Sequence, residues 1–155
     1  MVSPELLRRY SFFRSLTEQQ LANLAMQSEE IRFDDQQVIL EEGETARNLY
    51  FLLEGCVDLF YTVEQNFHSH KRKEVLVGQI NPGEPFGIST IIEPHIFTST
   101  ARSCGISRLL RLKSDGLDKL FIDDPELEIF MLRNMARAAL ERLNTARVQL
   151  AAAWS

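Results

Sequence analysis

The hydrophobic and polar positions follow three patterns along the chain, and each pattern marks one region. In residues 1–28, Leu21, Leu24 and Ala25 fall on one helical face, so this region is predicted to be an N-terminal helical segment. Thr17 followed three positions later by Gln20 is the pattern of a capping box, in which each side chain accepts a hydrogen bond from the other residue's backbone N–H. We therefore expect the main helix of this region to begin after Thr17.

Residues 29–112 consist of short runs rich in β-branched and aromatic residues, which are typical of β-strands. Turns with glycine separate the runs, and at Asn81-Pro82-Gly83-Glu84 the proline and glycine favour a type II turn. Many short strands with regular turns indicate an antiparallel β-roll or jelly roll. The predicted strands lie at 31–33, 38–40, 49–53, 57–61, 75–77 and 109–110.

Residues 113–155 return to a helical pattern and are predicted to form the C-terminal helices. We expect Ser114 to cap a short helix, and Asp124 to cap a long one that has Pro125 in its first position. The long helix carries apolar residues at alternating spacings of four and three, which is the pattern of a coiled-coil seam. This seam predicts a homodimer joined through Leu132, Ala136, Ala139, Leu143, Ala146 and Leu150.

Length and composition are those of one globular domain that includes all three regions, with 155 residues of which 45% are hydrophobic. The net charge of −5 argues against nucleic acid as the main partner of this domain alone, because DNA binding requires a basic surface. No secretory signal is apparent, and no apolar stretch reaches the ~20 residues of a membrane-spanning helix, so we expect a cytoplasmic protein with no membrane partner. No group of residues indicates catalysis, so we expect no enzyme, no catalytic residue, no metal and no cofactor.

The segment from Asn81 to Arg102 is the most informative part of the sequence, because it resembles the phosphate-binding cassette of cyclic-nucleotide-binding domains. The resemblance to this family, which includes the catabolite activator protein and kinase regulatory subunits, extends over nearly the whole chain. It rests on the combined spacing of Gly43, Gly55, Gly83 and Gly87. The family implies a β-roll flanked by helices, ligand sensing, and dimerisation through the long C-terminal helix.

The sequence departs from the family at the two charged residues of the cassette. In the family, a glutamate after the cassette glycine accepts the ribose hydroxyl, and an arginine before the small residues pairs with the cyclic phosphate. By position, Ile88 and Phe97 replace them, so ordinary cyclic AMP binding is not expected. Ile88 and Phe97 either line an apolar ligand site or fill the core. The residues assigned to the ligand site are Gly87, Ile88, Ser89, Phe97, Thr98, Ser99 and Arg102.

Three functions remain open from the sequence. The first is a non-enzymatic regulatory module that senses a small anionic or neutral ligand, and the second is a structural or interaction domain without a ligand. The third is the sensor half of a transcription regulator without its DNA-binding domain.

Some individual residues also have two interpretations. For His95 an exposed loop position is favoured over anion binding, and for Arg102 a solvent-facing position over the pocket. For His68 and His70 a hairpin loop is favoured over a metal site, since the sequence supplies no nearby third ligand.

Overall fold

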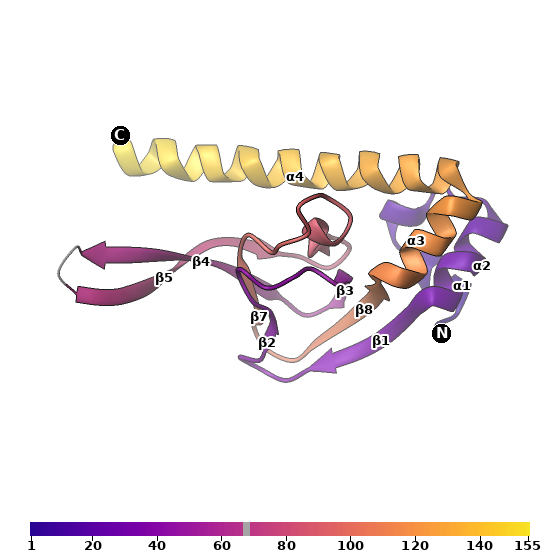
Figure 1. Cartoon of the computed structure of the whole chain (residues 1–155), viewed down its shortest axis with the longest axis horizontal. Coiled ribbons are helices and arrows are strands. Elements are labelled where there is room, and N and C mark those ends of the chain that lie inside the picture. Colours follow the sequence, from indigo (N-terminus) through magenta and orange to yellow (C-terminus); the bar gives the residue numbers. More distant parts are fainter. Residues whose placement is uncertain (67–68) are drawn as a thin grey trace.

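The computed structural model describes the backbone of residues 1–66 and 69–155 and the side chains of residues 1–64 and 72–155. Two four-stranded sheets form an antiparallel roll, with helices gathered at one end and one long helix lying along it (Figure 1). The predicted fold class, mainly β with flanking helices, is therefore confirmed. One sheet contains β1 (Ser28–Phe33), β8 (Ser107–Lys113), β3 (Asn48–Glu54) and β6 (Pro85–Phe86), in that order. The other contains β2 (Val38–Leu40), β7 (Thr100–Ser103), β4 (Val57–Asn66) and β5 (Ser69–Ile80).

Strand β3 lies at the centre of the roll and contains an unbroken run of apolar residues. Successive side chains of a strand point to opposite faces, and both faces of β3 are covered. Leu49, Phe51 and Leu53 belong to the core cluster that the helices complete. Tyr50 and Leu52 belong to a second cluster, inside the roll. The first sheet is thus sandwiched between the helices and the second sheet.

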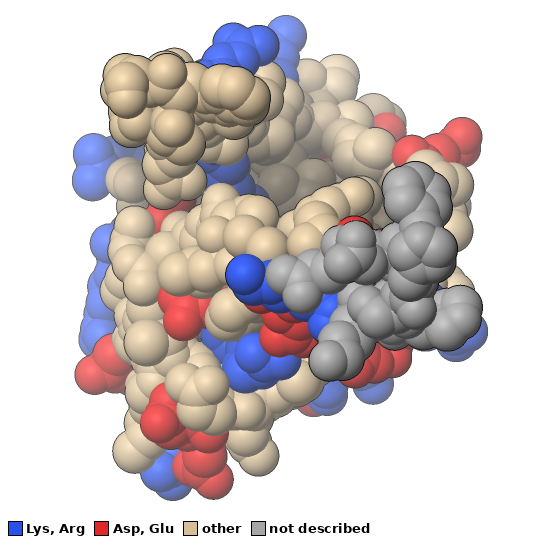
Figure 2. All heavy atoms as spheres, turned by 90° about the vertical axis from the view of Figure 1, so that its left-hand side faces the viewer, with Lys and Arg blue, Asp and Glu red and all other residues tan. Residues whose placement is uncertain are grey.

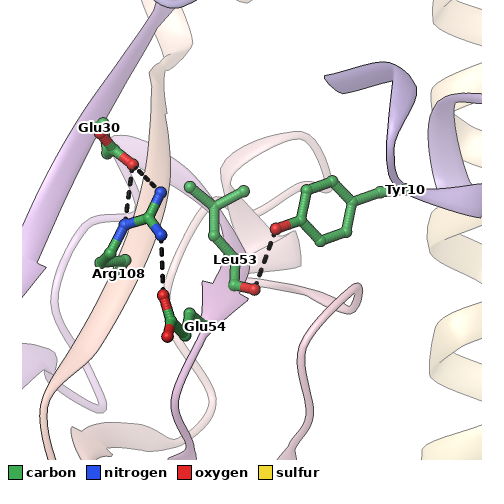
Figure 3. Close-up of polar contacts among 5 residues, drawn as sticks. All are labelled: Tyr10, Glu30, Leu53, Glu54 and Arg108. Atoms are coloured by element: carbon green, nitrogen blue, oxygen red, sulfur yellow. Dashed lines mark hydrogen bonds and ion pairs between the residues drawn. The ribbon is translucent and has the colours of Figure 1, made fainter. Parts of the chain in front are cut away.

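The N-terminal helical segment packs on the outer face of the first sheet. It contains α1 (Pro4–Arg8), the short 3₁₀ helix η1 (Ser11–Phe13) and α2 (Glu18–Gln27). The predicted capping box is confirmed, because the Gln20 N–H donates to Thr17 Oγ1 at 3.1 Å and the Thr17 N–H donates to Gln20 Oε1 at 3.0 Å. The Tyr10 hydroxyl, between α1 and η1, donates to the carbonyl of Leu53 at 3.0 Å (Figure 3).

An arginine bridges three strands of the first sheet near this contact. Arg108 of β8 donates to Glu30 of β1 and, at 2.8 Å, to Glu54 of β3 (Figure 3). The three side chains are partly open to solvent, so the network contributes little to stability on its own. The network spans β1, β8 and β3, which are neighbours in the sheet through their backbone pairing.

Two helices follow β8, namely α3 (Ser114–Asp123) and α4 (Pro125–Trp154). The predicted cap of α4 is confirmed, because Asp124 Oδ1 accepts from the Leu127 N–H at 3.1 Å and Pro125 occupies the first turn. The predicted cap of α3 is wrong. Lys113 is the N-cap, without a side-chain bond, and Ser114 is the first helical residue. The Ser114 N–H instead donates to the Arg47 carbonyl at 2.8 Å, so β8 leads directly into α3.

Helix α4 is about 45 Å long at ~1.5 Å per residue, and it extends along the roll towards the β4–β5 hairpin (Figure 1). Its first half packs on the core through Leu127, Met131, Met135 and Ala138. From Ala139 onwards every residue is exposed except Arg142, which is half-buried. None of the described helices is long and apolar enough to cross a membrane.

Candidate ligand site between the cassette and helix α4

The cassette begins where β6 runs into the short 3₁₀ helix η2 (Ile88–Thr90). Gly87 joins them in the left-handed region, with φ of +73°. A Cβ atom at this position would lie 3.0 Å from the carbonyl oxygen of Asn48, so the turn requires a glycine. The hydroxyl of Thr90 donates to the same carbonyl at 2.7 Å. The cassette is therefore fixed closely against strand β3.

A cavity of about 320 Å³ lies between this cassette and α4. Six of the seven residues assigned to the site from the sequence line it, and Arg102 does not. One wall is apolar, and the cassette side offers three hydroxyls. The lining residues are Leu40, Leu59, Phe86, Gly87, Ile88, Ser89, Phe97, Thr98, Ser99, Ala139 and Arg142.

Ile88 and Phe97, which replace the family's two charged residues, make the inner wall of the cavity neutral. Phe97 is only 7% exposed and belongs to the core cluster inside the roll, while Ile88 packs partly against the helix-covered core. Both residues thus fill core and line the cavity at once. Among the described residues, no aspartate or glutamate lines this cavity.

Arg102 lies on the other face of its strand, which corrects its assignment to the site. Side chains alternate along β7, and Ala101 is the one that points into the core. The guanidinium of Arg102 instead pairs with Glu74 at 3.0 Å and lies 4.7 Å from the centre of the Phe60 ring. Arg102 is thus partly buried against Phe60 and Glu74, and it does not line the cavity.

His95 does not line the cavity. His95 is exposed, as favoured from the sequence, and its Nδ1 lies 3.1 Å from the Ser89 carbonyl oxygen within the cassette loop. The interpretation of His68 and His70 falls outside the described side chains.

Arg142 is the charged residue of the cavity that sequence reasoning missed, beside the apolar Leu40, Leu59 and Phe86. Its guanidinium reaches from α4 to donate a hydrogen bond to the carbonyl of Pro85, one residue before Phe86. Its Nε is buried and finds no acceptor among the described residues. Burial lowers the pKa of this guanidinium, while the nearby carboxylates of Glu84 and Glu141 act in the opposite direction. In the sequence Arg142 is one of several helix arginines, and only the path of α4 over the cassette distinguishes it.

A wider groove of about 620 Å³ continues from the cavity between α4 and strand β5. Leu59 and Arg142 line both spaces, so the arginine stands at the junction between them. Figure 2 looks at this end of the molecule, and the surface is hollowed between the end of α4, at the top, and the strands below it. The groove gives the cavity an open side.

Two cysteines and an aspartate meet at another part of the roll. Ligand atoms of Cys56, Asp58 and Cys104 all lie within 4.8 Å of one another, although 48 positions separate the two cysteines in the sequence. Burial, helped by the neighbouring Cys104 and Asp58, raises the pKa of the Cys56 thiol to about 11. None of the three lines the cavity. Sequence spacing gave no sign of this cluster, because pairing between strands creates it.

Comparison with known proteins identifies the family to which the cassette belongs. The family model of the cyclic nucleotide-binding domain matches residues 30–124, which is more than half of the chain. The chain belongs to the cyclic nucleotide-binding domain family. This region runs from β1 to the cap of α4 and includes the whole cassette.

Two relatives show the range of proteins in which this domain occurs. The chain is 27% identical over 140 residues to the CRP-like cAMP-activated global transcriptional regulator of Mycobacterium tuberculosis. This match covers 90% of the chain but 59% of the relative, so the chain spans well under two thirds of that protein. Over 116 residues it is 23% identical to the cAMP-dependent protein kinase regulatory subunit of Dictyostelium discoideum, covering 75% of the chain and 35% of the relative.

A solved structure matches the chain almost from end to end. It is that of a candidate cyclic nucleotide-binding protein from Geobacter metallireducens GS-15, with 38% identity and a TM-score of 0.78. The match covers 92% of this chain and 99% of that one. The fold of the family is therefore present over nearly the whole sequence.

Proposed function

We propose that the chain is a non-enzymatic, ligand-sensing regulatory module that acts as a homodimer in the cytoplasm. The observation that carries the proposal is the cavity, which the cassette and α4 enclose together. A ligand in it would contact the roll through Ser89, Thr98 and Ser99, and the long helix through Ala139 and Arg142. A ligand that touches both elements alters their relative position if it binds one arrangement better than the other.

The homodimer would form along α4, between Pro125 and about Ala153. Of the six seam residues, Leu132 is half-buried and the other five are exposed, and among these Ala139 also lines the cavity. Leu143 and Leu150 are 45% and 61% exposed in the single chain. Covering each leucine fully would contribute about 1.5–3 kcal/mol, and the alanines between them allow two helices to approach closely.

Light scattering on the wild type and two variants tests the dimer. Leu143→Glu places a charge in the seam and is expected to give a monomer at tens of micromolar. Val148→Glu is the matched control, because Val148 is 63% exposed on the same helix but five positions beyond Leu143, away from the seam. A monomeric wild type, or a Leu143→Glu variant that remains dimeric, would exclude this interface.

Cyclic AMP is expected to bind more weakly than the micromolar range. Ile88 and Phe97 supply no charge, and an ionic hydrogen bond contributes about 1.5–3 kcal/mol net, so losing two costs about a hundredfold or more in affinity. Isothermal titration calorimetry with cyclic AMP measures this directly. Saturable micromolar binding would contradict the expectation.

A second candidate function is the sensor part of a longer transcription regulator. The observation that favours it is the match to the Mycobacterium tuberculosis regulator, which uses 90% of the chain and 59% of the relative. The domain would then pass its signal along α4 to a further segment. Gel-shift assays on the protein encoded by the complete gene, with and without ligand, test this function. The remaining alternative, an interaction domain without a ligand, would be supported if no small molecule shifts the thermal unfolding.

A further inference from the structure

We propose that Arg142 holds the charged end of a small organic monoanion in the cassette cavity, so that the counter-charge of the ligand comes from α4 and not from the cassette. This inference rests on the proposed ligand-sensing function and names the chemistry of its ligand. In this chain Phe97 occupies the position at which the family has the cassette arginine. The proposed positive charge instead lies on α4.

The first support is that, among the described residues, Arg142 is the one charged residue that lines the cavity. A guanidinium can donate five hydrogen bonds, and Arg142 donates one to the Pro85 carbonyl. Its buried Nε has no acceptor among the described residues, and no described carboxylate lies within 4.0 Å of it as an ion pair. A buried, charged donor without a partner is costly, and an anion beside it removes that cost.

The position of Arg142 on α4 is the second support. All other residues of the helix beyond Ala138 are exposed, and Arg142 alone turns inward to the junction of cavity and groove. Lys or Arg residues on a helix normally extend to water and cover apolar surface with their stems. Arg142 is instead half-buried, with its Nε covered and its guanidinium bonded to Pro85 beside the cavity.

The rest of the lining selects the kind of anion. Leu40, Leu59, Phe86 and Phe97 form an apolar wall, so the body of the ligand is apolar. Three hydroxyls on the cassette can donate to the second oxygen of a carboxylate or phosphodiester. With a single cation, and with Glu84 and Glu141 near it, the site favours one negative charge over two. The volume of about 320 Å³ limits the ligand to a compact molecule.

Binding of the anion would also change what α4 contacts. In the structure the guanidinium is bonded to Pro85, in the strand that leads into the cassette. An anion in the cavity can accept from donors that Pro85 does not use, among them the Nε without a partner. The ligand then adds a second link between α4 and the cassette, beside the bond to Pro85. Arg142 thus couples occupancy of the cavity to the position of the helix.

The test combines a charged and a neutral probe of similar shape with variants in which only an arginine is changed. Phenylacetate and phenylacetamide have nearly the same shape, and NMR titration measures millimolar affinities for both. We expect the wild type to bind phenylacetate at least tenfold more tightly. Arg142→Gln should abolish this preference, and Arg142→Lys should retain part of it. Arg147→Gln is the matched control, because Arg147 lies exposed on the same helix and lines neither space.

Each outcome decides between the inference and its alternatives. If the wild type binds neither probe, or binds both equally, the monoanion site is wrong. If Arg142→Gln keeps the preference while remaining folded by circular dichroism, Arg142 is not the counter-charge. Cyclic AMP, itself a monoanion, is titrated in parallel. Micromolar binding that Arg142→Gln abolishes would support Arg142 as the counter-charge and contradict the expected weak binding of cyclic AMP. The light-scattering test of the dimer is independent of all these results.

Discussion

Replacing Gly87 by alanine tests how closely the cassette is packed on the roll. The residue has φ of +73°, and a left-handed conformation costs a residue with a Cβ about 1–2 kcal/mol. The new Cβ would also lie 3.0 Å from the Asn48 carbonyl oxygen and 3.4 Å from side-chain atoms of Leu40 and Tyr50. Overpacking of this kind costs a further 1–3 kcal/mol, roughly. We therefore expect Gly87→Ala to lower the free energy of unfolding by about 2–5 kcal/mol.

Gly105→Ala separates the two contributions. Gly105 has φ of +75°, but nothing lies within 4 Å of the Cβ that it would gain. The backbone strain and the effect on the unfolded chain are thus shared, and the difference lies in the contacts of the new Cβ with Asn48, Leu40 and Tyr50. Urea unfolding at one fixed protein concentration should show Gly87→Ala to be less stable than Gly105→Ala by at least about 1 kcal/mol. Equal losses within 0.5 kcal/mol, roughly the additivity error, would refute the close packing.

Three further predictions concern other parts of the fold. Tyr10→Phe removes the hydrogen bond to Leu53 and should lower the free energy of unfolding by about 1 kcal/mol in urea, whereas an unchanged value would mean that water replaces the bond. Asp124→Ala removes the cap of α4 and should cost about 1 kcal/mol, while Asp123→Ala, one position earlier, should be nearly neutral. With its pKa near 11, the Cys56 thiol should react with iodoacetamide at pH 8 at least about tenfold more slowly than a free thiol, and faster as pH rises. Mass spectrometry of the peptide that contains Cys56 measures this in the wild type, because Cys104 contributes to the raised pKa. Rapid alkylation at pH 8 would contradict the burial of this thiol.

The fold could be predicted from the sequence because its signals are local. The capping box at Thr17, the cap at Asp124 and the apolar runs of the strands each depend on residues a few positions apart. The error at Ser114 has the same origin, because the backbone partner that replaces a side-chain cap is Arg47, from a distant part of the chain. What the sequence does not show directly is which elements lie against each other.

The candidate site was predictable only on its cassette side. Gly87, Ser89 and Thr98 lie within a short segment, and the family pattern brings them together. Arg102 was misplaced because the register of β7, which turns it away from the core, depends on pairing with β2 and β4. Arg142 was missed because it is 55 residues beyond Gly87, and its position depends on how α4 crosses the roll. The same holds for the cluster of Cys56 and Cys104.

The position of the positive charge has a consequence for how this domain could signal. A ligand shifts a conformational equilibrium only by the difference in its affinity for the two states. The cassette is fixed to β3 through Gly87 and Thr90. If the positive charge were in the cassette, the ionic contact of an anion would be with this fixed part, and its contacts with α4 would be weaker. With the charge on Arg142, the strongest contact of the ligand depends on where α4 lies. Leu143 is the next residue, rotated by about 100° around the helix, and Ala139 belongs both to the cavity lining and to the proposed seam. A change in the position of this turn of α4 would therefore reach the ligand site and the proposed dimer seam together.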